Sequence, residues 1–120
     1  MAMGSVSALR GRTVLVVEDE CLIALDIVEQ LSAAGAEAVV TRSIEQAIGA
    51  LARLKFAAAI VDHRLSDGDA YEVIRRLEKL QVPFLIHSGY EEVDAWANAP
   101  VVRKPATRGH LIQTVSDLLG

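Results

Sequence analysis

Cysteine and aromatic residues are scarce in this sequence. Among its 120 residues there is one cysteine, Cys21, with two phenylalanines, two tyrosines and one tryptophan. A single cysteine excludes an internal disulfide, so we expect a reducing compartment and a cytoplasmic location. With so few aromatic rings, the core must be built from aliphatic side chains, which agrees with a hydrophobic fraction of 52%.

Positive charge and long apolar runs are also scarce. The formal net charge is −4, so the chain lacks the basic surface that nucleic-acid phosphates require. Its apolar runs are shorter than the roughly 18 residues that a membrane span needs, and residues 1–12 lack the apolar core of a signal peptide. We therefore expect a flexible leader at 1–12 and one folded domain at 13–120 that binds neither nucleic acid nor membrane directly.

Apolar runs alternate with stretches of helical spacing along the chain. This alternation indicates an α/β fold with a mostly parallel sheet and helices on both faces. The pattern is weakest over residues 89–99, so we expect the fourth helix to be short or absent. The predicted strands are Thr13–Val17, Ala36–Thr41, Ala57–Val61, Phe84–His87 and Val101–Arg103, and the predicted helices cover about 20–34, 44–54, 70–80 and 108–119.

Local patterns predict where helices begin and end and which faces they bury. Ser43 with Gln46 three residues later is a capping-box pattern that predicts the start of the second helix. Gly35 suits the position just past the end of the first helix. The first helix is expected to bury an apolar stripe, which consists of Leu22, Leu25, Ile27, Val28 and Leu31.

Charged and hydroxyl side chains follow the predicted strands at one edge of the sheet. The acidic residues 18–20 follow the first strand, Asp62 the third, Ser88 the fourth and Lys104 the fifth. Alone, each has an ordinary structural explanation, because acids favour helix starts and serine is a common turn residue. In open parallel sheets, however, ligands bind beyond the carboxyl ends of the strands. Their convergence on that edge therefore favours a functional site.

The residue types at this edge suit phosphoryl transfer. Carboxylates held close together raise one another's pKa values unless a cation offsets their charge. Oxygen ligands with room for water suit Mg²⁺, which usually takes one or two carboxylates together with phosphate oxygens. A carboxylate can then attack phosphorus while metal, ammonium and hydroxyl groups stabilise the charge on the phosphoryl oxygens.

The motifs at these strand ends resemble those of response-regulator receiver domains of two-component signalling. The matching segments are VLVVEDE, IVDHRLSDGD, PFLIHSGY and VVRKP, and the resemblance extends from Thr13 to Leu119. PFLIHSGY is similar to a phrase found in small stand-alone receivers. The resemblance implies a flavodoxin-like, doubly wound sheet of five parallel strands in the order 2-1-3-4-5.

The resemblance also implies a role for each acidic residue. Asp62 looks like the phosphoacceptor, which takes a phosphoryl group from a histidine kinase or a histidine phosphotransfer protein. Glu18 and Asp19, together with Asp62 and the backbone carbonyl of Arg64, look like the ligands of Mg²⁺. Glu20 is expected to be only a charge at the start of a helix. The implied protein is a regulatory phosphoprotein of a phosphorelay, which catalyses only its own phosphoryl transfer and dephosphorylation and acts on an unknown output protein.

Four further residues receive roles from the same resemblance. Ser88 looks like the switch hydroxyl that turns toward the phosphoryl group, and Lys104 like the lysine that contacts it. Arg64 and Tyr90 lie two residues past Asp62 and Ser88, at positions whose side chains flank the phosphoryl group in the family. Our hypothesis is that their bulk slows hydrolysis of the acyl phosphate.

The sequence departs from the family pattern on one face. Val101 stands where the family usually has a rotating aromatic residue, and the interval from Ser88 to Lys104 is shorter than usual. We therefore expect the usual output face to be rebuilt. Glu18 stands where aspartate is commoner, so Asp19 is expected to dominate metal contact.

Two other functions were weighed against a phosphorylated switch. One is a degenerate receiver that acts as a phosphorylation-independent protein-binding module, although the intact Asp62, Asp19 and Lys104 argue against it. The other is a flavodoxin-like cofactor binder, which the acids after the first strand disfavour because they would repel a phosphate. A zinc site is not indicated, since the three histidines show no ligand spacing.

Overall fold

The computed structural model describes residues 9–65, 67–89, 99–104 and 108–120. The main strands are β1 (Thr13–Val17), β2 (Glu37–Thr41), β3 (Ala58–Asp62), β6 (Phe84–Ser88) and β7 (Val101–Arg103), and the helices are α2 (Cys21–Ala33), α3 (Ile44–Arg53), α4 (Tyr71–Leu80) and α5 (Arg108–Leu119). The five strands are parallel and lie in the order β2-β1-β3-β6-β7. This confirms the predicted order, because the short strands β4 and β5 belong to a separate hairpin.

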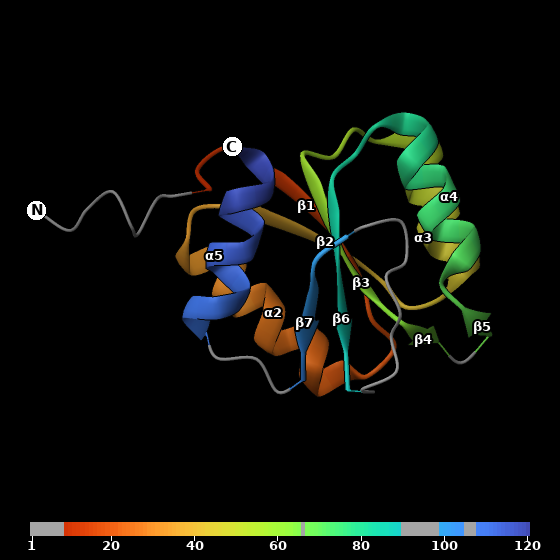
Figure 1. The fold of residues 1–120 in the computed structure, drawn as a ribbon, viewed down its shortest axis with the longest axis horizontal. Helices are drawn as coiled ribbons and strands as arrows, with labels where there is room; N and C mark the ends of the chain where they lie inside the picture. Colours follow the sequence, from red (N-terminus) through yellow and green to blue (C-terminus); the bar gives the residue numbers. More distant parts are fainter. Residues whose placement is uncertain (1–8, 66, 90–98, 105–107) are drawn as a thin grey trace, which may run out of the picture.

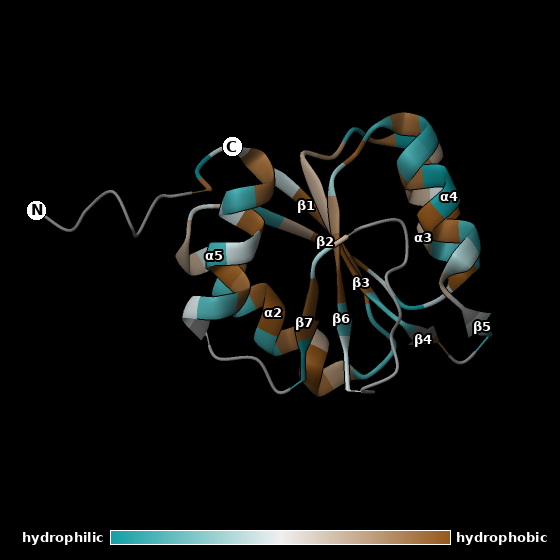
Figure 2. Cartoon of the chain, viewed as in Figure 1, coloured by the Kyte–Doolittle hydropathy of each residue, from teal (hydrophilic) through white to brown (hydrophobic). Residues whose placement is uncertain are grey.

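The sheet lies between two helical layers (Figure 1), with α2 and α5 on one face and α3 and α4 on the other. Alternate residues of β1 enter the two layers: Val14 and Val16 pack with α2 and α5, whereas Leu15 and Val17 pack with α3 and α4. Strands β3 and β6 are buried at every position. The strands are accordingly mostly hydrophobic along their length, while the helices carry both kinds of residue (Figure 2). Coverage on both faces explains the continuous apolar runs in the sequence.

The first helix buries only part of the predicted stripe. Leu22 is 82% exposed and Leu25 is 57% exposed, whereas Ala24, Ile27 and Leu31 are buried. The prediction holds for Ile27 and Leu31 and was wrong for Leu22 and Leu25. Residues two apart on a helix do not share a face, and Leu25 lies about 200° around the helix from Ile27. The small side chain of Ala24 is buried in place of Leu22 and Leu25.

The local signals at helix ends are confirmed. Gln46 N donates to Ser43 Oγ at 3.0 Å, and the Gln46 side chain accepts from Arg42 N at 2.8 Å. The returning bond of this capping box thus reaches one residue earlier than the standard pattern. Gly35 has a φ of +93°, and a Cβ there would lie 3.0 Å from the Cα of Arg10. Glycine therefore meets both a conformational and a steric requirement.

A hairpin that the sequence did not predict follows Asp62. Its strands are β4 (Arg64–Leu65) and β5 (Gly68–Asp69), which pair antiparallel. Asp67 accepts from Ile44 N at 3.1 and 3.2 Å through its two oxygens, so the hairpin turn is held at the start of α3. Strands of two residues are too short for periodicity to reveal.

Parts of the predicted leader and the predicted short fourth helix lie outside the described residues, at 1–8 and 90–98. Of residues 9–12, which the sequence assigned to the leader, Leu9 is buried and residues 10–12 are exposed. Leu9 is fully buried and its N–H donates to Ala34 O at 2.9 Å. Within the part of the chain that is described, no helix is long and apolar enough to cross a membrane.

Candidate functional site

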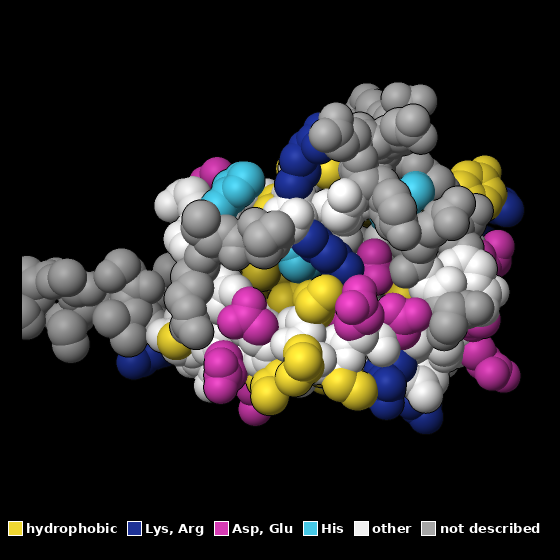
Figure 3. Space-filling model, turned by 90° about the horizontal axis from the view of Figure 1, so that it is seen from below, with side chains coloured by type: hydrophobic (Ala, Val, Ile, Leu, Met, Phe, Trp, Pro, Cys, Tyr) yellow, Lys and Arg dark blue, Asp and Glu magenta, His cyan; other side chains and the backbone are white. Residues whose placement is uncertain are grey.

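The carboxyl ends of two neighbouring strands bring three acidic side chains together. Glu18 and Asp19 directly follow β1, and Asp62 is the last residue of β3, which pairs with β1. One oxygen from each carboxylate lies within 4.8 Å of the others. Glu18 is 1% exposed and Asp62 is 6% exposed, while Asp19 is half-buried. Figure 3 looks onto this edge of the molecule and shows acidic side chains gathered beside a hollow.

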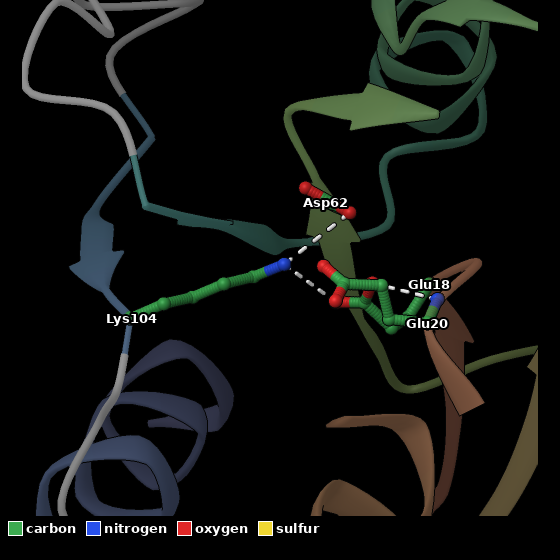
Figure 4. Close-up of polar contacts among 4 residues, drawn as sticks. All are labelled: Glu18, Glu20, Asp62 and Lys104. Carbon is green, nitrogen blue, oxygen red and sulfur yellow. Dashed lines mark hydrogen bonds and ion pairs between the residues drawn. The ribbon is translucent and has the colours of Figure 1, made fainter. Parts of the chain in front are cut away.

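Lys104 reaches this cluster from the other end of the sheet edge (Figure 4). Its Nζ lies 2.8 Å from Glu18 Oε1 and 3.3 Å from Asp62 Oδ2. The backbone positions it, because Lys104 N donates to Ser88 O at 2.8 Å and so extends the pairing of β6 with β7. The Lys104 side chain is 14% exposed. One largely buried ammonium thus faces two buried carboxylates.

Burial and charge set the ionisation of this group. Burial raises the pKa of Glu18 above its ordinary value; Lys104 and the N–H of Glu20 oppose the rise, and repulsion from Asp62 adds to it. For Lys104, burial alone would lower the pKa, but the carboxylates of Glu18 and Asp62 outweigh burial and raise it. The lysine is therefore held as a cation in a cluster that has more acidic groups than basic ones.

The oxygen atoms of the cluster fit a hard metal cation. Glu18 Oε1 lies 2.8 Å from Lys104 Nζ, and Glu18 Oε2 accepts from Glu20 N at 3.2 Å. Three carboxylates are an oxygen-only ligand set, which suits Mg²⁺ rather than Zn²⁺. Three converging carboxylates around a single ammonium leave net negative charge, which a divalent cation would stabilise.

The structure describes some of the other predicted site residues fully and others only in part. Ser88 is the last residue of β6, fully buried, one position beyond the partner of Asp62 in the neighbouring strand. The backbone of Arg64 begins β4, two residues past Asp62, but its side chain lies outside the described part of the structure, as does all of Tyr90. Glu20 is exposed and precedes α2, and it contributes its backbone N–H to Glu18 Oε2 at 3.2 Å.

Sequence reasoning missed two contacts that support the site. Asp67 fastens the hairpin after Asp62 to the start of α3, and the Asp67–Gly68 pair was an available turn signal. Arg42 Nη2 donates to Asp19 O at 3.4 Å, which links the end of β2 to the acidic cluster. This second contact depends on the pairing of β2 with β1, so local pattern alone did not reveal it.

Comparison with solved structures identifies proteins of the same fold. No protein-family model and no curated protein matches the sequence. Among solved structures, a response regulator receiver protein from Sinorhizobium medicae WSM419 is 26% identical with a TM-score of 0.83, and the match covers 90% of this chain and 94% of that one.

Two other solved structures are similar over almost their whole length. The receiver domain of a sensor histidine kinase from Pseudomonas aeruginosa PAO1, described with a magnesium ion in its active-site cleft, is 22% identical with a TM-score of 0.82, covering 92% of this chain and 98% of that one. A response-regulator receiver domain from Erythrobacter litoralis is 24% identical with a TM-score of 0.81, covering 93% and 92%. The fold is that of a receiver domain, and the resemblance that the motifs indicated is confirmed.

Proposed function

We propose that this chain is a phosphorylation-dependent signalling switch in which Asp62 accepts a phosphoryl group. The observation that carries the proposal is the position of Lys104, whose Nζ lies 3.3 Å from Asp62 Oδ2 beside the buried Glu18. An ammonium at this distance can stabilise negative charge that develops next to the attacking carboxylate. A structural ion pair alone would not need a second buried acid.

The reaction proceeds by attack of an Asp62 carboxylate oxygen on phosphorus. The donor is a phosphohistidine of a histidine kinase or a phosphotransfer protein. A phosphorus–oxygen bond forms, the phosphorus–nitrogen bond breaks, and its electron pair returns to the imidazole of the donor. Lys104 binds the phosphoryl oxygens, and the Ser88 hydroxyl at the end of β6 turns toward them. Water later hydrolyses the acyl phosphate and restores Asp62.

Glu18, Asp19 and Asp62, with the backbone carbonyl of Arg64, would hold Mg²⁺. When bound, the metal neutralises charge on the phosphoryl oxygens. A magnesium ion in the active-site cleft of a similar receiver and the convergence of the three carboxylates within 4.8 Å support this assignment. Lys104 offsets part of the same negative charge, so the chain itself lowers the repulsion that an incoming phosphate meets.

Phosphorylation would change the balance of contacts that fixes Lys104. The acyl phosphate brings about two negative charges, which compete with Glu18 for the lysine. Because Lys104 directly follows β7, a shift of its side chain acts on the end of that strand. We infer that this changes the affinity for an output protein. Val101, half-buried against the α3–α4 layer, cannot supply the rotating ring of the family, so the coupling would use other residues.

Incubation with acetyl phosphate and Mg²⁺, followed by intact mass measurement, tests the proposal. We expect the mass of one phosphoryl group to be added, and the addition to disappear with EDTA or in Asp62→Asn. Asp117→Asn is the matched control because it alters an exposed carboxylate on α5, away from the acidic cluster, and it should still be phosphorylated. If neither acetyl phosphate nor a phosphohistidine donor adds the group, the chain is a binding module instead.

A further inference from the structure

A pocket of about 380 Å³ lies between α2 and α5, on the opposite face of the sheet from α3 and α4. We call it the α2–α5 pocket. Leu111 of α5 and leucine and isoleucine side chains at the start of α2 give it apolar walls, and its polar groups belong to Asp26, Gln30, His87 and Lys104. Figure 3 shows a histidine in the hollow beside a basic side chain and the acidic cluster.

Three buried polar atoms on residues of this pocket lack hydrogen-bond partners among the described residues. They are both ring nitrogens of His87 and the Oε1 of Gln30, and each of these residues is 4% exposed. Gln30 uses its other polar atom, since Nε2 donates to Asp26 Oδ2 at 2.9 Å. Buried polar groups in folded proteins are almost always hydrogen-bonded. Three unsatisfied atoms at one pocket therefore indicate an occupant that supplies partners.

The polar groups of the pocket favour a ligand that donates hydrogen bonds. Burial, and then the charge of Lys104, lower the pKa of His87 to about 4, so at neutral pH its ring has one N–H and one acceptor nitrogen. Gln30 Oε1 and the Asp26 carboxylate are acceptors as well. The ammonium of Lys104 is engaged by carboxylates of the acidic site. Acceptors thus outnumber available donors, and an anionic ligand would meet Asp26.

We propose that the α2–α5 pocket binds a small, flat, largely apolar molecule that carries an N–H donor, of the class of nitrogen heterocycles. The volume far exceeds the share of one water molecule, about 30 Å³, and aliphatic walls with a few convergent polar groups are typical of small-molecule sites. The N–H group of the ligand would donate to Gln30 Oε1 or to the unprotonated ring nitrogen of His87. This inference stands apart from phosphorylation, because it uses neither Asp62 nor a metal.

Indole and benzofuran are suitable probes because they share a bicyclic shape and only indole has an N–H. Each is titrated into the ¹⁵N-labelled full chain and followed by two-dimensional NMR. We expect indole to shift the amides of α2 and α5 that surround the pocket. A hydrogen bond to an otherwise unpaired acceptor should make indole bind about tenfold more tightly than benzofuran.

Two variants remove the unsatisfied atoms while keeping the side-chain bulk. His87→Phe deletes two ring nitrogens that have no hydrogen-bond partner among the described residues, and Gln30→Leu deletes the unpartnered Oε1 together with the part-buried bond from Nε2 to Asp26. Both variants should fold, and the preference for indole should fall toward equality in at least one of them. Gln113→Leu is the matched control: Gln113 Nε2 makes the same kind of bond, to Asp117 Oδ1 at 2.9 Å, but on the exposed side of α5. It should leave the preference unchanged.

Several outcomes would overturn the proposal. Equal affinities of the two probes for the unmodified chain would show that the polar atoms do not select a donor. Amide shifts centred on the pocket beside Phe56 and Val82 would place binding elsewhere. An absence of shifts up to the solubility of indole would mean that the pocket holds water, or receives only side chains of a protein partner.

Discussion

Replacement of Lys104 by methionine should destabilise the fold at neutral and higher pH. Methionine keeps an apolar stem in place but removes the cation that lies 2.8 Å from Glu18 Oε1 and 3.3 Å from Asp62 Oδ2. Two buried carboxylates are then left without their counter-ion. Removing one partner of a buried ion pair costs about 3–5 kcal/mol. Because the lysine is 14% exposed and Glu18 can take up a proton, we expect Lys104→Met to lower the free energy of unfolding by about 2–3 kcal/mol at pH 8.

The loss should depend on pH in a defined direction. The pKa of Glu18 in the folded state lies above its ordinary value of 4.5, and removal of Lys104 would raise it further. A group with a raised folded pKa contributes stability below its unfolded pKa and loses that contribution as the pH rises through the folded value. The cost of Lys104→Met should therefore be much smaller at pH 4.5 than at pH 8.

Urea unfolding followed by far-UV circular dichroism, in EDTA at both pH values, measures this difference. Glu18→Gln is the comparison variant, because it removes the excess acid and leaves Lys104 paired with Asp62. We expect it to lower the free energy of unfolding by less than about 1 kcal/mol or to raise it. Mg²⁺ should restore part of the stability that Lys104→Met loses, since a bound cation stabilises the folded state. An equal loss at both pH values would assign the effect to packing and refute the electrostatic reasoning.

Three further predictions concern other parts of the molecule. His87, whose folded pKa is about 4 against an ordinary 6.5, stays neutral in the folded state. Urea unfolding should therefore show that the unmodified chain loses stability relative to His87→Phe as the pH falls from 6.5 toward 4, by up to about 3 kcal/mol. Gly35→Ala should cost about 1–2 kcal/mol in thermal unfolding, because φ is +93° and the new Cβ would meet the Arg10 backbone. Arg64→Ala and Tyr90→Ala should each shorten the lifetime of the acyl phosphate, and unchanged decay would contradict the hypothesis that their bulk slows hydrolysis.

The pattern of the sequence was sufficient for the alternation of strands and helices and for the convergence of Asp62 and Lys104, whereas the strand order came from the motif resemblance. Apolar runs mark the strands, and polar residues such as Asp62 and Lys104 stand where the runs end. A parallel sheet then brings those ends to one edge. The motif resemblance assigned the roles, and structural comparison bears out the receiver fold.

The features that sequence could not supply depend on how elements pack. The first helix is apolar on more than one side, so only its contact with the sheet decides that Ala24 is buried while Leu22 is exposed. The unpartnered nitrogens of His87 become visible only once α2 and α5 are placed over β6. The pairing of Lys104 with both Glu18 and Asp62 also depends on packing, because the lysine side chain must extend along the edge of the sheet from β7 to reach the two carboxylates.

The central claim is that Asp62 itself carries the phosphoryl group, and chemical trapping tests it most directly. Borohydride reduces an acyl phosphate to an alcohol, which converts a phosphorylated aspartate into homoserine that survives peptide mapping. After treatment with acetyl phosphate and Mg²⁺, we predict homoserine at position 62 and unchanged aspartate at Asp19 and Asp67. Homoserine at another acidic residue, or at none despite a competent phosphohistidine donor, would contradict the assignment of Asp62 as the phosphoacceptor.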